Sequence, residues 1–284
     1  MAVISKVLVA ALVAGAVNAL PQQGYQKSST APYPTATGVA TPAATPPMDA
    51  DMISQIVNAP SQLDKFKSFA TVGGLGKMLK SVEELAKFVI FDFKSERPAN
   101  QLGGVAKGAN VDNFPILSGL GIATTLGFLE PCGMNTPHVH PRATEFLTLV
   151  EGSDLKFGYV LENGLVEAGQ NAEIAGTLQK FQGTVFPIGS IHYQFNDSPD
   201  CTPATFVAAL NSDDPGTNQI AQGFFGLNPD IVNATLGFPK QIDGSNIAQF
   251  RKSIPPNLAQ GIDSCLARCK RDIANFPLPT PAAR

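Results

Sequence analysis

The chain of 284 residues carries little charge, few histidines and no tryptophan. Only 15% of its residues are charged, and 20 Lys and Arg against 23 Asp and Glu give a formal net charge of −3. Hydrophobic residues make up 44%, which is enough to bury a core and argues against an intrinsically disordered chain. A mildly acidic chain without a run of basic residues also argues against nucleic acid as its main partner.

Long apolar segments are missing after the first 19 residues, and that first segment is short. Lys6 precedes an apolar run over Val7–Val17, followed by Asn18 and Ala19. This run has fewer than the roughly 20 apolar residues that cross a bilayer, so we predict that residues 1–19 are a signal peptide. The C-terminus has no hydrophobic tail for a lipid anchor. We therefore expect a secreted protein, extracellular or in the cell wall, with no membrane partner.

The four cysteines include no C-x-x-C pair, which argues against a cysteine zinc site. They suit the oxidising compartment that a secreted protein enters and allow three pairings. Cys265 and Cys269 are four residues apart in an expected helix, where Cβ atoms lie about 5–6 Å apart. A disulfide needs roughly 3.8 Å between its Cβ atoms. We therefore favour a bond between Cys132 and Cys201 and leave the other two cysteines open.

The composition divides the rest of the chain into a linker and one domain. Residues 20–50 are rich in Pro, Thr, Ser and Ala with almost no charge, which predicts an extended, disordered linker. Residues 51–284 form the predicted domain. Its first part suggests short amphipathic helices interrupted at Pro60, and Ser81 with Glu84 forms an expected capping box.

Short strands dominate the middle of this domain. The chain has 26 Gly and 23 Pro, and such turn residues favour many short strands over long helices. Strands are expected at residues 88–93, 122–129, 145–152, 155–160, 184–187 and 204–211. The pattern predicts an all-β sandwich or barrel over about residues 88–237. A helical pattern returns after Asn218, with C-terminal helices expected over about 238–276. No internal repeat divides the domain.

All three histidines fall into two short segments. His138 and His140 are two residues apart, and on a strand this spacing puts both imidazoles on one face. Glu145 follows on the next expected strand, and His192 opens another strand after a Pro-Ile-Gly turn. Imidazole is the commonest metal ligand in proteins, and three imidazoles with one carboxylate suit a divalent ion such as Mn, Fe, Ni or Zn. We predict that His138, His140, Glu145 and His192 are metal ligands.

These two segments resemble the two sequence boxes of germins and germin-like proteins in the cupin superfamily. The first box reads GMNTPHVHPRATEFLTLVEG, and the second includes PIGSIHYQFN. The residues that match are His138, His140, Glu145 and Gly152 in the first box, and Pro187, Gly189, His192 and Asn196 in the second. Cys132 and Phe181 stand where each box usually has its leading Gly. The amino-acid sequence of these segments most resembles that of the spherulin-like branch of fungi and slime moulds.

The resemblance implies a single jelly-roll β-barrel that holds one ion, typically Mn²⁺, through the four predicted ligands. Fe²⁺ or another divalent transition metal is the alternative. Germins assemble as trimers of dimers, so the resemblance also implies a homo-oligomer, a trimer or a hexamer.

The implied activity is an oxidoreductase that acts on a small anionic substrate, like superoxide dismutase or oxalate oxidase. Germins that oxidise oxalate hold it with two Asn. Asn135 matches one of these, and Thr125 stands at the place of the other. The alternatives are a non-catalytic, metal-binding wall or stress protein and an Fe-dependent cupin oxygenase.

Two sequons occur in the chain. Asn233-Ala-Thr is a predicted glycosylation site. Asn196-Asp-Ser lies inside the second box and is followed by Pro199, so we do not expect it to carry a glycan.

Overall fold

The computed structural model describes residues 50–94, 102–237, 254, 258–260 and 262–270. The predicted signal peptide, nearly all of the predicted linker and most of the predicted C-terminal helices lie outside these residues. Within the described residues, no helix has both the length and the apolar character needed to cross a membrane.

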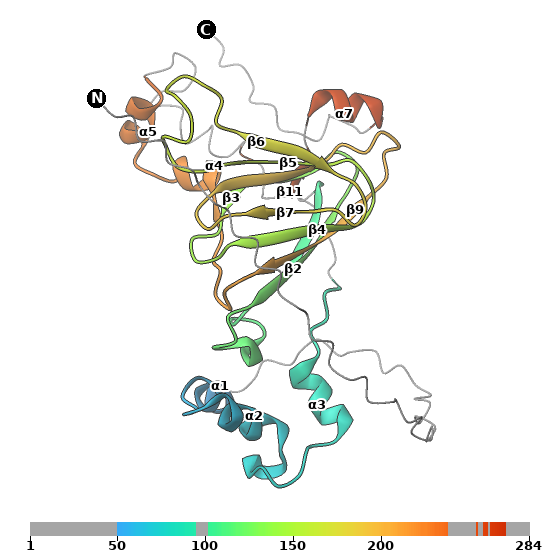
Figure 1. The fold of residues 1–284 in the computed structure, drawn as a ribbon, viewed down its shortest axis with the longest axis vertical. Helices are drawn as coiled ribbons and strands as arrows, with labels where there is room; N and C mark the ends of the chain where they lie inside the picture. Colours follow the sequence, from blue (N-terminus) through green and yellow to red (C-terminus); the bar gives the residue numbers. More distant parts are fainter. Residues whose placement is uncertain (1–49, 95–101, 238–253, 255–257, 261, 271–284) are drawn as a thin grey trace, which may run out of the picture. The chain divides into compact units, whose positions relative to one another are not determined.

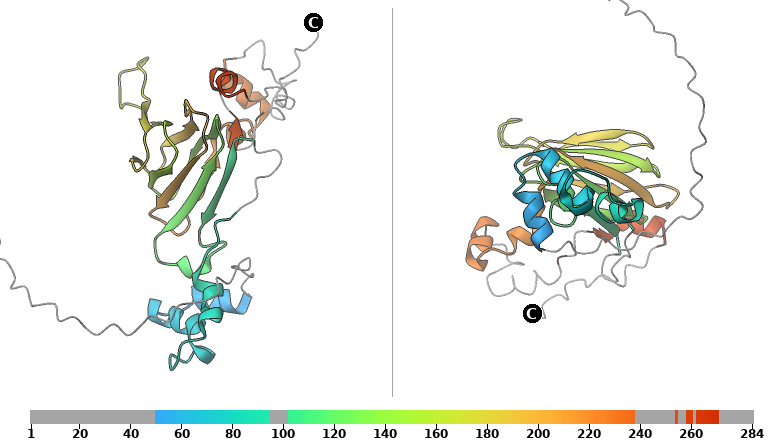
Figure 2. Two further views of the ribbon diagram at one scale, coloured as in Figure 1. Left: turned by 90° about the vertical axis from the view of Figure 1, so that its right-hand side faces the viewer. Right: turned by 90° about the horizontal axis from the view of Figure 1, so that it is seen from below.

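Two antiparallel sheets lie face to face and form a sandwich (Figures 1 and 2). The five-stranded sheet has the order β1 (Gly104–Ala109), β2 (Ala123–Leu129), β9 (Ala204–Leu210), β4 (Glu145–Glu151) and β7 (Gly183–Phe186). The other sheet has the order β10 (Asn218–Gln219), β3 (Gly133–Val139), β8 (Ile191–Asn196), β5 (Leu155–Val160) and β6 (Ile174–Leu178), with β11 (Leu258–Gln260) also paired to β3. The predicted all-β jelly roll is confirmed.

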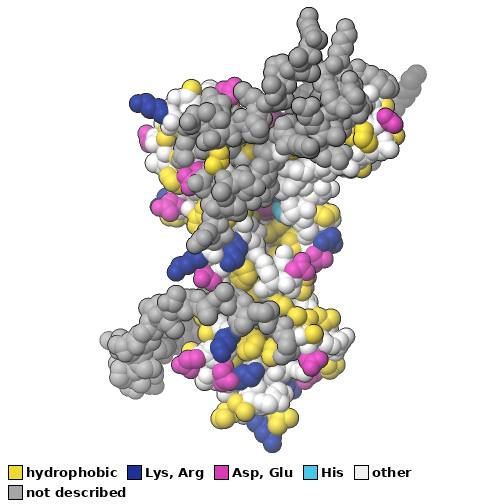
Figure 3. Space-filling view, turned by 180° about the vertical axis from the view of Figure 1, so that it is seen from behind, with side chains coloured by type: hydrophobic (Ala, Val, Ile, Leu, Met, Phe, Trp, Pro, Cys, Tyr) yellow, Lys and Arg dark blue, Asp and Glu magenta, His cyan; other side chains and the backbone are white. Residues whose placement is uncertain are grey.

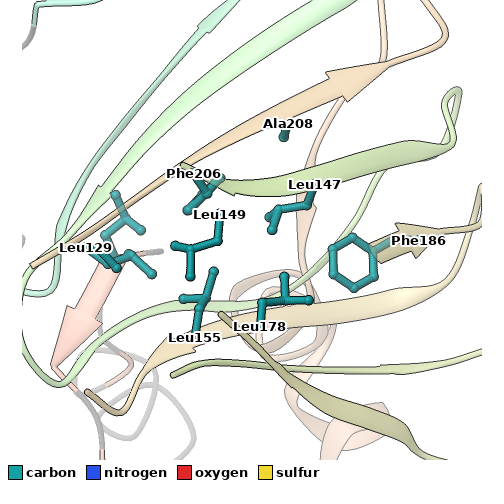
Figure 4. Packing of buried hydrophobic residues seen from close by; sticks show 10 residues of the cluster. Leu129, Leu147, Leu149, Leu155, Leu178, Phe186, Phe206 and Ala208 are labelled. Carbon is teal, nitrogen blue, oxygen red and sulfur yellow. The ribbon is translucent and has the colours of Figure 1, made fainter. Parts of the chain in front are cut away.

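The core lies between the two sheets because the strands alternate inward and outward side chains. On β4, Leu147 and Leu149 are buried while Phe146 is exposed, as the period of two in a strand requires. Figure 4 shows these inward side chains meeting those of the opposite sheet. Burying each large apolar side chain stabilises the fold by about 1.5–3 kcal/mol. The cluster consists of Leu129, Leu147, Leu149, Leu155, Leu178, Phe186, Ala204, Phe206, Ala208 and Leu258.

Short helices flank the sandwich, as predicted. They are α1 (Ala50–Val57), α2 (Gln62–Ala70), η1 (Val72–Gly74), α3 (Val82–Val89), η2 (Pro115–Leu117), α4 (Ile220–Phe224), α5 (Pro229–Thr235) and α7 (Asp263–Arg268). The capping box is confirmed, because the Ser81 side chain accepts from the Glu84 N–H and the Glu84 side chain accepts from the Ser81 N–H. A small separate core forms around Ile56, Phe69 and Ile116.

The strand predicted at residues 88–93 is wrong. Helix α3 continues to Val89, and residues 90–94 form no strand. The capping box starts a helix that runs into the apolar segment, and the Phe88 ring then packs 6.1 Å from Phe69. The first strand of the sandwich is instead Gly104–Ala109, whose sequence GVAKGA has no apolar alternation to signal it.

The helical pattern predicted from Leu258 onward is correct only in part. Residues 263–268 form α7, but Leu258–Gln260 form β11. This short strand pairs with Gly133–Asn135 of β3, so the free edge of that sheet overrides the local preference for a helix.

All four cysteines are paired, but the predicted bond between Cys132 and Cys201 is wrong. Cys132 is bonded to Cys265, with Cα atoms 5.7 Å apart, and Cys201 is bonded to Cys269, with Cα atoms 5.5 Å apart. Cys265 lies in α7, and Cys269 directly follows this helix, with its N–H donating to the Cys265 carbonyl at 2.9 Å. Each is bonded to a cysteine outside this segment, so the expectation that they do not bond to each other is confirmed.

Candidate metal centre

Strands β3 and β8 bring two imidazoles directly opposite each other. His138 on β3 pairs with His192 on β8 across the sheet, and their ring centroids lie 4.2 Å apart. The register of the two strands shifts between Asn135 and His138, where Pro137 has no N–H to donate to a ladder. His140 directly follows the last residue of β3, and its ring lies 5.3 Å from that of His192.

The fourth side chain comes from the opposite sheet. Glu145 is the first residue of β4 and shares its inward face with Leu147 and Leu149. Its Oε2 lies 2.9 Å from Nε2 of His140 and 3.5 Å from Nε2 of His192. The four predicted ligands are all buried, and their potential ligand atoms lie within 4.8 Å of one another. The structure therefore brings together all four side chains that the sequence selected.

Backbone carbonyls fix the orientation of the three imidazoles. Nδ1 of His138 lies 2.8 Å from the Thr136 carbonyl, Nδ1 of His140 lies 2.6 Å from the Gly216 carbonyl, and Nδ1 of His192 lies 2.9 Å from the Ser190 carbonyl. A carbonyl oxygen only accepts, so each Nδ1 carries the hydrogen. The neutral ring then keeps its lone pair on Nε2, which is the arrangement found in metal-ligating histidines.

The residues present fit a divalent metal ion. Nε2 of His192 is buried and has no hydrogen-bond partner among the described residues. Leaving a buried polar atom unpaired costs about 1–3 kcal/mol, and a cation held jointly with Glu145 removes that cost. Three nitrogens and one carboxylate oxygen are a donor set of intermediate softness, which Mn, Fe, Ni and Zn accept.

Burial and close contacts set the protonation of these groups. Burial, together with the neighbouring His192, lowers the pKa of His138 to about 3, so this ring is neutral at neutral pH, as a metal ligand must be. Burial alone would raise the pKa of Glu145, but its close contacts with His140 and His192 outweigh burial and lower the pKa to about 2. Burial opposes protonation of His140, yet its contact with Glu145 raises the pKa of that ring.

The aromatic ring of Phe186 supports the centre and was missed by the sequence reasoning. It stacks on His192 with the centroids 4.3 Å apart and the planes 13° from parallel. Phe186 is also the cross-strand partner of Glu145 between β4 and β7, so it lies beside two of the predicted ligands. Its position directly before the Pro-Ile-Gly turn of the second box is the sequence feature that could have identified Phe186.

A cavity of about 710 Å³ opens onto the centre. Its wall includes Asn135 and Thr125 together with His138, His140 and Glu145. On the face shown in Figure 3, histidine is visible only as a small cyan area, in keeping with the burial of the imidazoles. Asn135 is buried and its Nδ2 donates to Oε1 of Gln194 at 2.7 Å. This use of one amide hydrogen leaves the other hydrogen of Asn135 for a ligand.

The two sequons have different surroundings. Asn196 is fully buried, and its Nδ2 donates to the carbonyls of Leu129, Glu130 and Thr202. This amide ties the end of β8 to the end of β2, a role in the second box that the sequence reasoning did not identify. Asn233 lies within α5 and is partly exposed, with its Oδ1 buried. Glycosylation of Asn233 stays a prediction.

A two-sheet β-sandwich that gathers three imidazoles and a carboxylate from both sheets defines a metal-binding cupin. The Cupin family model matches residues 91–247, and the chain belongs to this family.

Its curated relatives place the chain among germin-like cupins near the spherulins. Spherulin-1A of Physarum polycephalum is 36% identical over 221 residues, which cover 77% of this chain and 79% of that protein. Spherulin-1B of the same organism is 36% identical over 236 residues, covering 81% and 84%. Germin-like protein 1-3 of Oryza sativa subsp. japonica is 38% identical over 165 residues, covering 57% and 69%.

A solved structure shares the fold at lower identity. The structure of oxalate oxidase in complex with the substrate analogue glycolate has a TM-score of 0.51 and 22% sequence identity. The match covers 62% of this chain and 85% of that one.

Proposed function

We propose that this protein is a secreted cupin that holds Mn²⁺ and acts as an oxidoreductase on a small oxygen-containing anion, either superoxide or oxalate. The ligands are His138, His140, Glu145 and His192. One observation carries the proposal: three imidazoles, each held at Nδ1 by a backbone carbonyl, converge with a buried carboxylate beside a cavity that His138, His140 and Glu145 help to line.

The charge of the centre suits an anionic substrate. Three neutral imidazoles and one carboxylate contribute a single negative charge, so a divalent ion leaves a net charge of about +1 by simple counting. When bound, Mn²⁺ supplies a one-electron redox couple and coordination positions that the four protein ligands leave open. The chain's own contribution is to keep His138 neutral and Glu145 ionised in a buried site.

The cavity wall favours superoxide over oxalate. Asn135 is one of two Asn that the resemblance to oxalate-oxidising germins implies for holding oxalate, and one of its amide hydrogens is already given to Gln194. Thr125 replaces the second Asn and has a shorter side chain with a single donor. A small monoanion needs fewer hydrogen-bond donors than a dicarboxylate. The few donors that Asn135 and Thr125 offer therefore suit superoxide better than oxalate.

Secretion and self-association belong to the same proposal. The apolar segment of residues 1–19 and the two disulfides suit an extracellular protein. A trimer or a hexamer follows from the resemblance to germins.

The test is elemental analysis of the full-length protein purified from the medium of expressing cells, followed by superoxide and oxalate assays on the same sample. We expect about one Mn per chain and superoxide dismutation. His140→Ala should lose both, and so should Glu145→Gln. Glu151→Gln is the matched control, because Glu151 lies on the same strand but is exposed, and it should keep the metal and the activity.

Each other outcome contradicts a stated part of the proposal. Iron in place of manganese would support a cupin oxygenase instead. A Mn-loaded protein that is inert toward both anions would leave a non-catalytic, metal-binding wall or stress protein. Full metal occupancy in His140→Ala would refute the ligand assignment.

A further inference from the structure

The two disulfides lie close together beside the ends of the strands that carry the ligands. The sulfur atoms of Cys132, Cys265 and Cys269 lie within 4.8 Å of one another. Cys132 directly precedes β3. Cys265 lies in α7, whose place Figure 1 shows, and Cys269 directly follows that helix. The sulfur of Cys269 is bonded to Cys201, and it also lies close to the bond between Cys132 and Cys265.

The two bonds differ in access to solvent. Cys132 and Cys265 are fully buried, whereas Cys201 and Cys269 are partly exposed. Thiol–disulfide exchange requires a thiolate to reach one sulfur of the bond. A reductant in solution can reach the bond between Cys201 and Cys269, while the inner bond is shielded from it. The thiolate best placed to attack the inner bond is Cys269 itself.

A cation lies beside one sulfur of the inner bond. Nη2 of Arg268 lies 3.3 Å from Sγ of Cys265, and it is fixed there by a contact of 2.6 Å with Oδ1 of Asp197. A positive charge beside a sulfur stabilises its thiolate, and the better-stabilised thiolate leaves faster. Attack by Cys269 should therefore fall on Cys132 and release Cys265.

We propose that these four cysteines form a thiol–disulfide exchange site that passes reduction from the surface to the buried bond. A dithiol reductant transfers two electrons to the bond between Cys201 and Cys269, giving two thiols and its own disulfide. The Cys269 thiolate then attacks Sγ of Cys132. A bond forms between Cys132 and Cys269, the bond between Cys132 and Cys265 breaks, and the electron pair stays on Cys265, which takes up a proton.

The exchange moves the attachment of β3 from Cys265, within α7, to Cys269, the residue that directly follows this helix. Cys132 also donates its N–H to the carbonyl of Asn196, the last residue of β8, at 3.1 Å. The site thus fastens the ends of both histidine-bearing strands. The exchange itself requires only sulfur chemistry and does not depend on which metal the centre binds.

The wild-type protein allows a direct test. It is treated with one equivalent of dithiothreitol, quenched in acid, alkylated with N-ethylmaleimide and digested with trypsin. Trypsin cleaves after Arg268, so Cys265 and Cys269 fall on different peptides. We expect label on Cys201 and Cys265 and a linked pair of peptides carrying Cys132 and Cys269. Label confined to Cys201 and Cys269 would overturn the proposal.

Two matched variants test the same step without a reductant. Cys201→Ser leaves Cys269 as a free thiol beside the inner bond, and Cys269→Ser leaves Cys201 as the free thiol instead. In Cys201→Ser we expect Cys265 to be labelled to within about tenfold of Cys269. In Cys269→Ser, Cys265 should stay unlabelled. Equal labelling of Cys265 in the two variants, or none in Cys201→Ser, would contradict exchange through Cys269.

Discussion

Replacing His138 by Asn tests whether this ring is buried and neutral in the metal-free protein. The Asn amide can donate to the Thr136 carbonyl in place of Nδ1, but it does not titrate. Burial lowers the pKa of His138 from 6.5 to about 3. Below pH 6.5, His138 therefore binds a proton in the unfolded chain but stays neutral in the folded protein. The free energy of unfolding of the wild type falls as the pH falls.

The size of the loss follows from the width of this pH window. Each pH unit below 6.5 costs about 1.4 kcal/mol in free energy of unfolding, until the pH reaches the folded pKa of about 3. Between pH 7.5 and pH 5 the wild type should lose about 2 kcal/mol through His138 alone. The His138→Asn variant lacks this loss, so the stability difference between the two proteins should shift by about 2 kcal/mol in favour of the variant.

Urea unfolding at pH 7.5 and pH 5 measures this shift, on both proteins after removal of metal with a chelator. The other titrating groups are present in both proteins and drop out of the comparison. Any fixed cost of the substitution is the same at the two pH values and drops out as well. A difference in stability that stays constant with pH would refute the reasoning, because it would mean that His138 titrates in the folded protein as it does in the unfolded chain.

Two further substitutions test the support of the site and the backbone of the second box. Phe186→Leu removes the ring that stacks on His192, and we expect metal affinity, measured by titration calorimetry, to fall roughly tenfold; unchanged affinity would mean that stacking does not orient the imidazole. Phe181 has a φ of 68° and is 75% exposed. Phe181→Gly should raise the free energy of unfolding by about 0.5–1 kcal/mol, and a lower urea midpoint would contradict this.

The sequence allowed the strands and the ligand set to be predicted because both depend on local spacing. Alternation marked the strand that begins at Glu145, and the two-residue interval placed His138 and His140 together. Box spacing then added His192, although that residue is more than fifty positions away from His140. Each of these inferences needs only the two-residue period of a strand and the side-chain types that bind metal ions.

Features that depend on tertiary contacts were missed or predicted wrongly. The pairing of Cys132 with Cys265 depends on where α7 lies, and the sequence carries no local signal for that. The strand expected at residues 88–93 does not form, because a helix that starts at a capping box runs to Val89. Cys132 and Phe181 replace the leading Gly of each box, yet both keep a positive φ, of 61° and 68°. The positive φ is therefore kept at both positions, although neither residue is a glycine, the type that usually adopts it.

The disulfide between Cys132 and Cys265 encloses both boxes within one covalent loop. These cysteines are separated by 133 positions, and the loop contains all four predicted ligands. A protease that cuts the backbone once anywhere inside this loop leaves two fragments that are still joined through sulfur. The nicked protein should therefore run as a single band in a non-reducing gel and fall apart only after the sulfur bridges are reduced.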